Sequence, residues 1–387
     1  MPHKSLSISV EPKVLIWARK SIGSNTGEVA KRLKVSENTI AGWESGQKKP
    51  TLLQLEKLAK TIYKRPLAAF FLPSPPTEPA LPTDFRTLPA DRELPFSSKT
   101  RLAIRRAQRL QSLATELRGT ITKEAFKIGS ISLSDDPEEV AIKIRNDLKV
   151  DAQTQFHWKD ENIALNEWKK VLENRGILVF QLGMPIEEAR GFSLTDNKIP
   201  TVVLNLRDSI NGRMFSLFHE YAHLLLDKSG ICDMEEQDYL QQEDKTIERF
   251  CNHFAGAILV PKDILLAHDL VKLRKWSDEL LEKIARSFKV SQEVILRRLV
   301  IFGLASRDLY KRKHEEWLIQ AKEKQKEKRP FKISQPTKCI KQNGAPFVSL
   351  VLDANKKGEI TYSDVADYLG VRIKHIPKIE QLIGEKI

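Results

Sequence analysis

Residues 211–227 read NGRMFSLFHEYAHLLLD, and their apolar side chains recur at intervals of three and four positions. This periodicity predicts a helix that is largely buried. His219 and His223 are four residues apart, so their imidazoles share one helix face and can bind the same divalent ion. Glu220 is then close enough to take a proton from a water on that ion without being a ligand. The segment therefore predicts a metal site with an acid–base carboxylate.

A catalytic zinc ion needs a third protein ligand and an open position for water. Residues 246–261, TIERFCNHFAGAILVP, are typical of a second helix, and they offer Glu248 as that ligand. Asn252 lies one turn later and is predicted to orient a histidine or the carboxylate. Tyr221 and His253 are both candidate donors to a developing oxyanion. Other acidic residues between the two helices could compete with Glu248 as the third ligand, but they lie in a connection that is expected to face solvent. They are Asp233, Glu235, Glu236, Asp238, Glu243 and Asp244.

Two other interpretations of this motif stay open. The histidines can be ordinary hydrogen-bonded residues of a buried helix, although this explains neither Glu220 nor Glu248. The group can also hold zinc in a structural or degenerate site without catalysis.

The segments before this motif mix helices and strands. Residues 135–149 and 160–174 have helical spacing, GILVFQL at 176–182 is typical of a strand, and residues 191–205 are typical of a β-hairpin. We therefore expect a mostly helical α+β chain. It would have an all-α helix-turn-helix domain at the N-terminus, a central zincin-like metallopeptidase domain with a small β-sheet, and a small helical C-terminal unit. No internal repeat is apparent.

Residues 29–50, VAKRLKVSENTIAGWESGQKKP, are typical of two short helices joined by a tight turn. Ser36 is the expected N-cap of the second helix, which would be presented to a DNA major groove. A helical protein-interaction module is the alternative, but the net charge of +8 over residues 1–75 favours nucleic acid. The candidate DNA contacts are Thr26, Ser36, Asn38, Thr39, Lys48 and Lys49.

Charge is distributed unevenly along the 387 residues. The total of +13 divides into +11 for residues 1–125, −5 for 126–310 and +7 for 311–387, so polyanions are expected at the two ends. A stretch rich in proline at 73–95 marks a linker. We expect a helix-turn-helix domain at 1–72, a linker at 73–98, a metallopeptidase domain at 99–310, and a charged helix with a small helical unit at 311–387.

The composition also bears on the cellular compartment. No window approaches 18 uninterrupted apolar residues, and the start has no apolar core of a secretory signal. Three widely spaced cysteines, Cys232, Cys251 and Cys339, suit a reducing compartment. These features predict a cytoplasmic protein without a membrane partner.

Two segments of this sequence resemble known protein families. Residues 29–50 resemble the XRE/Cro-type helix-turn-helix family, with Lys34 where a turn glycine is common and Thr26 where a glutamine is common. The hairpin, residues 213–226 and residues 247–261 look like the ImmA/IrrE family of zinc metallopeptidases, with Cys251 in place of an alanine. This second resemblance implies Zn²⁺ as the cofactor. It assigns the ligands and the catalytic residue to the positions predicted above: His219, His223 and Glu248 as ligands, Glu220 as catalytic residue, with Asn252 beside them.

The combined resemblance implies a DNA-binding transcriptional regulator with zinc-dependent endopeptidase activity. It would cleave a transcriptional repressor and so relieve repression during stress or mobile-element induction. The alternative is a transcription factor or antitoxin-like regulator that uses the metallopeptidase fold to sense or bind a partner without cutting it. Expected partners are double-stranded DNA and a repressor or other co-encoded protein, and a homodimer is left open. Residues 345–380 are either a second DNA-binding unit or a packing and interaction unit.

Overall fold

The computed structural model describes residues 6–78, 83–84, 96–119, 129–195, 199–227, 230–232, 242–327 and 333–385. The chain forms two compact units. One contains Met1–Leu81, Leu88–Gln108 and Gly183–Glu188, and the other contains Pro82–Thr87, Arg109–Leu182 and Ala189–Ile387. Most of the proline-rich stretch and the acids Asp233, Glu235, Glu236 and Asp238 lie outside the described residues.

The N-terminal unit is all-α around its own apolar core. It contains α1 (Pro12–Ser21), α2 (Thr26–Leu33), α3 (Glu37–Glu44), α4 (Leu52–Lys57), η1 (Leu58–Tyr63) and η2 (Leu67–Phe71). Lys34 ends α2 in the left-handed region, with φ of 63°, where a glycine costs less. Ser36 precedes α3 with an extended backbone, but its hydroxyl lies 2.8 Å from Thr39 Oγ1 and makes no cap hydrogen bond. Ser36 therefore occupies the predicted N-cap position with the expected backbone conformation, but its side chain does not cap the helix.

A second pair of helices is joined by a similar turn, which begins at a lysine in the left-handed region. Residues 284–295, IARSFKVSQEVI, parallel residues 29–40, VAKRLKVSENTI. They form the end of α13 (Asp278–Phe288) and the start of α14 (Gln292–Ile301). Lys289 ends α13 with φ of 57°, as Lys34 ends α2. Both segments share the Lys-Val-Ser turn between two helices, a short likeness that sequence reasoning did not single out.

The centre of the larger unit is a five-stranded sheet in the order β1-β5-β3-β4-β2. Its strands are β1 (Thr83–Asp84), β2 (Leu178–Leu182), β3 (Gly191–Leu194), β4 (Thr201–Asn205) and β5 (Gly230–Cys232). β3 and β4 form the predicted antiparallel hairpin, whereas β2 pairs with β4 in parallel. The strands β2, β3 and β4 are buried throughout, so both faces of the sheet are covered there.

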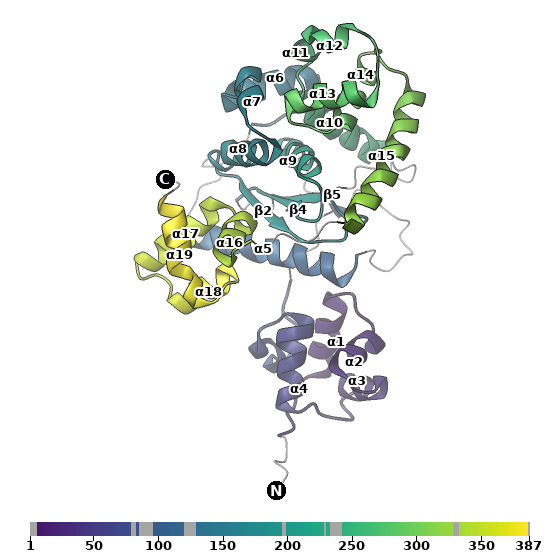
Figure 1. Ribbon diagram of the computed structural model, residues 1–387. Helices are drawn as coiled ribbons and strands as arrows, with labels where there is room; N and C mark the ends of the chain where they lie inside the picture. Colours follow the sequence, from purple (N-terminus) through teal and green to yellow (C-terminus); the bar gives the residue numbers. More distant parts are fainter. Residues whose placement is uncertain are drawn as a thin grey trace. The chain divides into compact units, whose positions relative to one another are not determined.

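Helices cover this sheet and make up most of the other described residues of the chain. Figure 1 shows α8 (Glu161–Glu173) and α9 (Ile210–Leu225) lying along one face, and α16 packs against β2. The other helices are α5 (Ser98–Arg118), α6 (Pro137–Leu148), α7 (Ala152–His157), α10 (Gln242–Leu259), α11 (Lys262–Ala267), α12 (Asp269–Lys272), α15 (Arg307–Glu327), α16 (Gln335–Asn343), α17 (Ala345–Lys356), α18 (Tyr362–Leu369), η4 (Ile373–His375) and α19 (Ile376–Gly384). The expected α+β class, mostly helical with a small sheet, is confirmed. Among the described residues no helix has both the length and the apolar character needed to cross a bilayer.

Candidate metal centre

Two packed helices carry the candidate ligands. α9 carries His219 and His223, α10 carries Glu248, and the two helices lie against each other. Ser209 begins α9 by accepting a hydrogen bond from the backbone N–H of Gly212. The apolar residues of α9 face the core, and this packing takes the histidines and Glu220 out of water as well. Both imidazoles and the carboxylate of Glu248 are buried.

The three side chains converge on one point. Nε2 of His219 lies 3.2 Å from Nε2 of His223, and each of these nitrogens lies 3.3 Å from an oxygen of Glu248. Ligand atoms about 2.0–2.1 Å from a zinc ion at tetrahedral angles are separated by about 3.3–3.4 Å. The spacing and the His–His–carboxylate chemistry of the donors both fit a zinc ion. Within the described part of the chain this is a buried group that can bind a metal.

Asn252 lies where the sequence predicts it, beside a histidine. Its Oδ1 is 3.1 Å from Nδ1 of His219. Nδ1–H therefore donates to the amide oxygen, and the lone pair of Nε2 is left to face Glu248. The contact selects the tautomer of His219 that a metal requires.

Burial and charge act in opposite directions on these groups. Burial alone would lower the pKa of His219, but the nearby carboxylate of Glu248 raises it overall. For His223, burial dominates and the pKa is lowered. Burial would raise the pKa of Glu248, yet the two imidazoles hold it well below its usual range. The carboxylate of Glu248 and the imidazole of His223 are therefore in the forms that bind a divalent cation, and a bound cation would displace the proton that Glu248 favours on His219.

The two candidate oxyanion donors contact other groups in the structure. Tyr221 is two residues beyond His219, about 200° around the helix, and it is buried beside Phe254, with ring centroids 6.3 Å apart. His253 turns to another partner, because its Nε2 is 2.6 Å from Oε1 of Glu138. The oxyanion role of either side chain stays a prediction, and for His253 it would require the contact with Glu138 to be broken.

Sequence reasoning missed the cluster that His253 joins. Glu138, in the first turn of α6, pairs through both carboxylate oxygens with Arg298 of α14, whose side chain is only 1% exposed. Burial would raise the pKa of Glu138, but hydrogen bonds from Arg298 and His253 lower it to about 2. The cluster ties α6, α10 and α14 together. Its members are too far apart in the chain for any local pattern to reveal them.

We expect Glu138→Ala to lower the free energy of unfolding by about 3–5 kcal/mol at pH 7, because it leaves the buried guanidinium of Arg298 without its counter-charge. Glu139→Ala is the matched control, since Glu139 is exposed in the same helical turn. Urea unfolding measures both. The folded-state pKa of Glu138 is depressed from 4.5, so its contribution is present above pH 4.5 and is lost as the pH falls toward 2. An equal effect of the two substitutions at pH 7 would contradict this role.

Gly191 is a second residue that the sequence did not mark. A Cβ built at this first residue of β3 would lie 3.2 Å from Oε1 of Glu220 and 3.0 Å from the carbonyl oxygen of Val203. The missing side chain therefore leaves room for the carboxylate of Glu220 against the sheet. A glycine at the start of an apolar strand is the signal that marks such a close approach.

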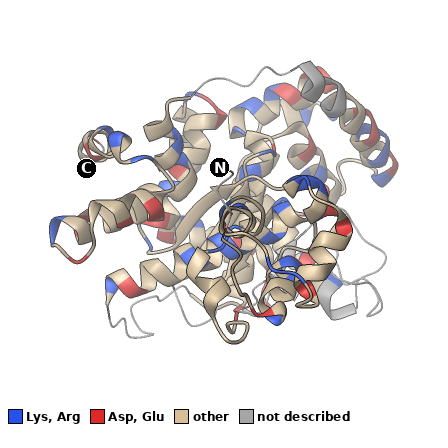
Figure 2. Cartoon of the chain, turned by 90° about the horizontal axis from the view of Figure 1, so that it is seen from below, with Lys and Arg blue, Asp and Glu red and all other residues tan. Residues whose placement is uncertain are grey.

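The predicted DNA contacts lie around α3. Asn38, Lys48 and Lys49 are exposed. Thr39 is half-buried, and its hydroxyl is hydrogen bonded to the hydroxyl of Ser36. The hydroxyl of Thr26 is hydrogen bonded to the carboxylate of Glu37, so a base contact would have to replace that bond. Figure 2 shows Lys and Arg interspersed with Asp and Glu along the helices of the chain.

Comparisons with known proteins match two separate segments of the chain. Residues 15–62 match a helix-turn-helix family, and residues 172–300 match the family of the IrrE N-terminal-like domain. The search of curated proteins found no match. A solved structure, a Mycobacterium tuberculosis transcriptional regulator, is 18% identical over 50% of this chain, with a TM-score of 0.31. The chain covers about half (51%) of that structure. The protein thus joins an XRE-type helix-turn-helix domain at residues 15–62 to a domain of the ImmA/IrrE type, a metallopeptidase-type fold, at residues 172–300.

Proposed function

We propose that this protein is a DNA-binding regulator with zinc-dependent endopeptidase activity, and that its substrate is a transcriptional repressor. The observation that supports this proposal most strongly is the buried triangle of two imidazoles and one carboxylate with Glu220 next to it in the chain. We assign DNA binding to residues 1–72 and cleavage to residues 99–310. Residues 73–98 would link these two domains, and residues 311–387 would form a charged helix and a small helical unit.

In this mechanism His219, His223 and Glu248 hold the zinc ion. A zinc ion held there would supply a water molecule of lowered pKa and would polarise the carbonyl of the peptide bond to be cut. Glu220 accepts the proton of the attacking water and delivers it to the leaving amine. Asn252 holds the imidazole of His219 in one orientation, and Gly191 leaves the space in which the carboxylate of Glu220 lies.

The helix-turn-helix domain would bring the peptidase to DNA where its substrate is bound. In this proposal Asn38 and Thr39 approach base edges at the start of α3, and Lys48 and Lys49 bind phosphates. Binding through phosphates weakens steeply as salt rises.

Gly191→Ala tests the space beside Glu220. The added methyl group would push against the Glu220 carboxylate and the β4 backbone, so we expect cleavage to fall by about 100-fold, as small misplacements of catalytic groups do. The bound zinc should remain, because no ligand is touched. Gly183→Ala is the matched control, since a Cβ there meets no atom within 4 Å. Initial cleavage rates compare the two, and a Gly191→Ala rate equal to the control would contradict the role of Gly191.

The function itself is tested with the purified chain and the products of the neighbouring genes, among which the proposal expects a transcriptional repressor. We expect the zinc-loaded protein to cut that repressor at a defined bond, detected by intact-mass spectrometry. A chelator should stop the reaction and added zinc should restore it. An intact repressor in the presence of zinc-loaded protein that still binds DNA would instead support a regulator that senses without cutting.

A further inference from the structure

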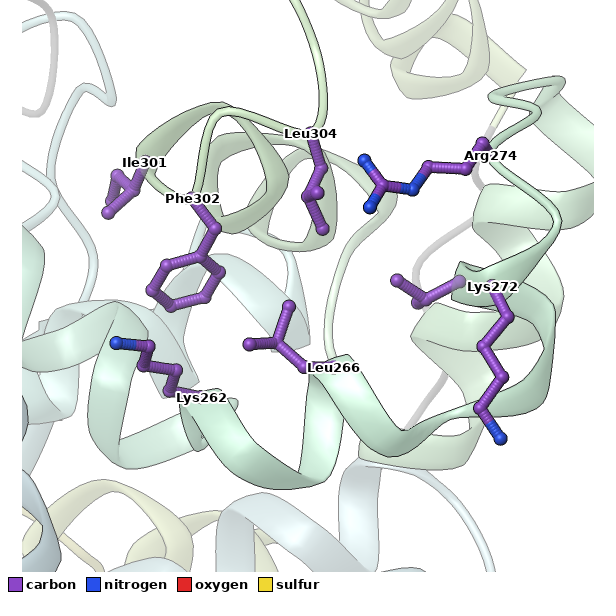
Figure 3. A pocket seen from close by; sticks show the side chains of 8 residues that line it. Lys262, Leu266, Lys272, Arg274, Ile301, Phe302 and Leu304 are labelled. Atoms are coloured by element: carbon purple, nitrogen blue, oxygen red, sulfur yellow. The ribbon is translucent and has the colours of Figure 1, made fainter.

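A cavity outside the metal centre lies in the α10–α15 region of the larger unit. Its volume is about 590 Å³, within the range of about 300–1,000 Å³ that is usual for small-molecule sites. It is formed by side chains from α11, α12, the end of α14 and the turns that follow, and none of them belongs to the His–His–Glu group. Figure 3 shows Leu266, Phe302 and Leu304 directed into it. Leu266 and Ile301 are 37% and 42% exposed, so apolar surface remains uncovered here.

Every charged side chain that lines this cavity is a cation. These are Lys262, Lys272 and Arg274. Lys272 is directed away from the cavity and pairs with Asp269 at 2.7 Å. The guanidinium of Arg274 points toward Leu304 and makes no hydrogen bond or ion pair within the described part of the chain. The guanidinium of Arg274, which is exposed, is therefore available to pair with an anion.

The walls of the cavity are held in place before any ligand arrives. The guanidinium of Arg298 lies 4.6 Å from the centre of the Phe302 ring, and Arg298 is itself fixed by Glu138. The indole N–H of Trp276 donates to the carbonyl oxygen of Leu304 at 2.9 Å, which ties the turn after α12 to the turn after α14. Arg274 lies in that first turn with φ of 53°, a strained conformation of the kind found at ligand clamps.

We propose that this cavity binds a small organic anion with an apolar body, such as an aromatic or branched aliphatic carboxylate. The apolar body would pack on Leu266 and Phe302, and the anionic group would pair with Arg274. Lys262, whose ammonium lies 5.7 Å from the centre of the Phe302 ring, adds a second positive charge at the other side of that ring. The site is independent of the proposed peptidase activity.

The test uses the fluorescent anion 1-anilinonaphthalene-8-sulfonate with the full-length protein. N-phenyl-1-naphthylamine, which has the same rings without the sulfonate, serves as the neutral probe. We expect the anion to bind at least about tenfold more tightly than the neutral probe, because only the sulfonate can form a charge-assisted hydrogen bond with Arg274. Arg274→Gln should remove this difference, whereas Lys272→Gln should change the affinity less than about twofold.

Leu266→Glu locates the binding site, because it places a negative charge on the apolar wall at a partly exposed position where folding is not at risk. We expect it to abolish binding of the anion while circular dichroism and thermal unfolding stay unchanged. Equal affinity of the two probes, or undiminished binding by Arg274→Gln or Leu266→Glu, would overturn the proposal. Displacement of the dye by an acidic leucine-containing peptide at lower concentration than by naphthalene-1-carboxylate would also overturn it, in favour of a peptide partner.

Discussion

Glu220→Gln is expected to leave zinc binding unchanged and to lower the rate of repressor cleavage by about 10²–10⁴-fold, the usual contribution of a general acid–base group. The amide has nearly the same shape as the carboxylate, so it fits the same buried space next to Gly191. It cannot accept a proton from the attacking water. Glu220 is not part of the His–His–Glu triangle, which explains why the metal should stay.

Cleavage rates and zinc content must be measured on the same preparations. Glu139→Gln, at an exposed position of α6, is the control and should match the wild type in both. A Glu220→Gln variant that keeps its zinc and still cuts at the wild-type rate would remove Glu220 from the mechanism. A variant that loses its zinc would mean that Glu220 is a ligand.

Glu248→Ala should have the largest effect on the metal. It removes the only carboxylate of the triangle, so zinc affinity should fall by more than the roughly 10–100-fold expected for Asn252→Ala, which removes only the partner of His219. Competition with a chromophoric chelator measures both affinities. If the two variants lose affinity equally, Glu248 is not a direct ligand.

The Glu248 substitution also has a pH signature in the metal-free protein. The pKa of Glu248 is held below its usual 4.5 because the two imidazoles outweigh the effect of burial. Its contribution to stability is therefore present above about pH 4.5 and is lost as the pH falls below that value. The difference in unfolding free energy between wild type and Glu248→Ala should narrow over that acidic range.

The sequence predicted those parts of the site that a single helix or a short spacing determines. The four-residue spacing of His219 and His223 places two imidazoles together in any helix, and the spacing of Glu248 and Asn252 does the same on α10. Two apolar runs on either side of a polar turn likewise predicted the hairpin that β3 and β4 form.

The missed features depend on contacts between distant segments. Glu138 and Arg298 are brought together only when α6 and α14 pack on the same core. The sequence of either helix alone therefore does not predict the ion pair. The fit of Gly191 against Glu220 depends in the same way on how α9 lies across the sheet. The sequence offered His253 as a candidate oxyanion donor, but it could not show that Glu138, 115 positions away in the chain, contacts its Nε2.

The central claim is that His219, His223 and Glu248 hold one zinc ion. The most direct measurement is the zinc K-edge X-ray absorption spectrum of the zinc-loaded chain. We predict nitrogen and oxygen neighbours at about 2.0–2.1 Å, with the outer-shell scattering of two imidazoles and no sulfur. A sulfur neighbour at about 2.3 Å would contradict this ligand set, because it would place a cysteine, such as the buried Cys251 one turn from Glu248, on the metal.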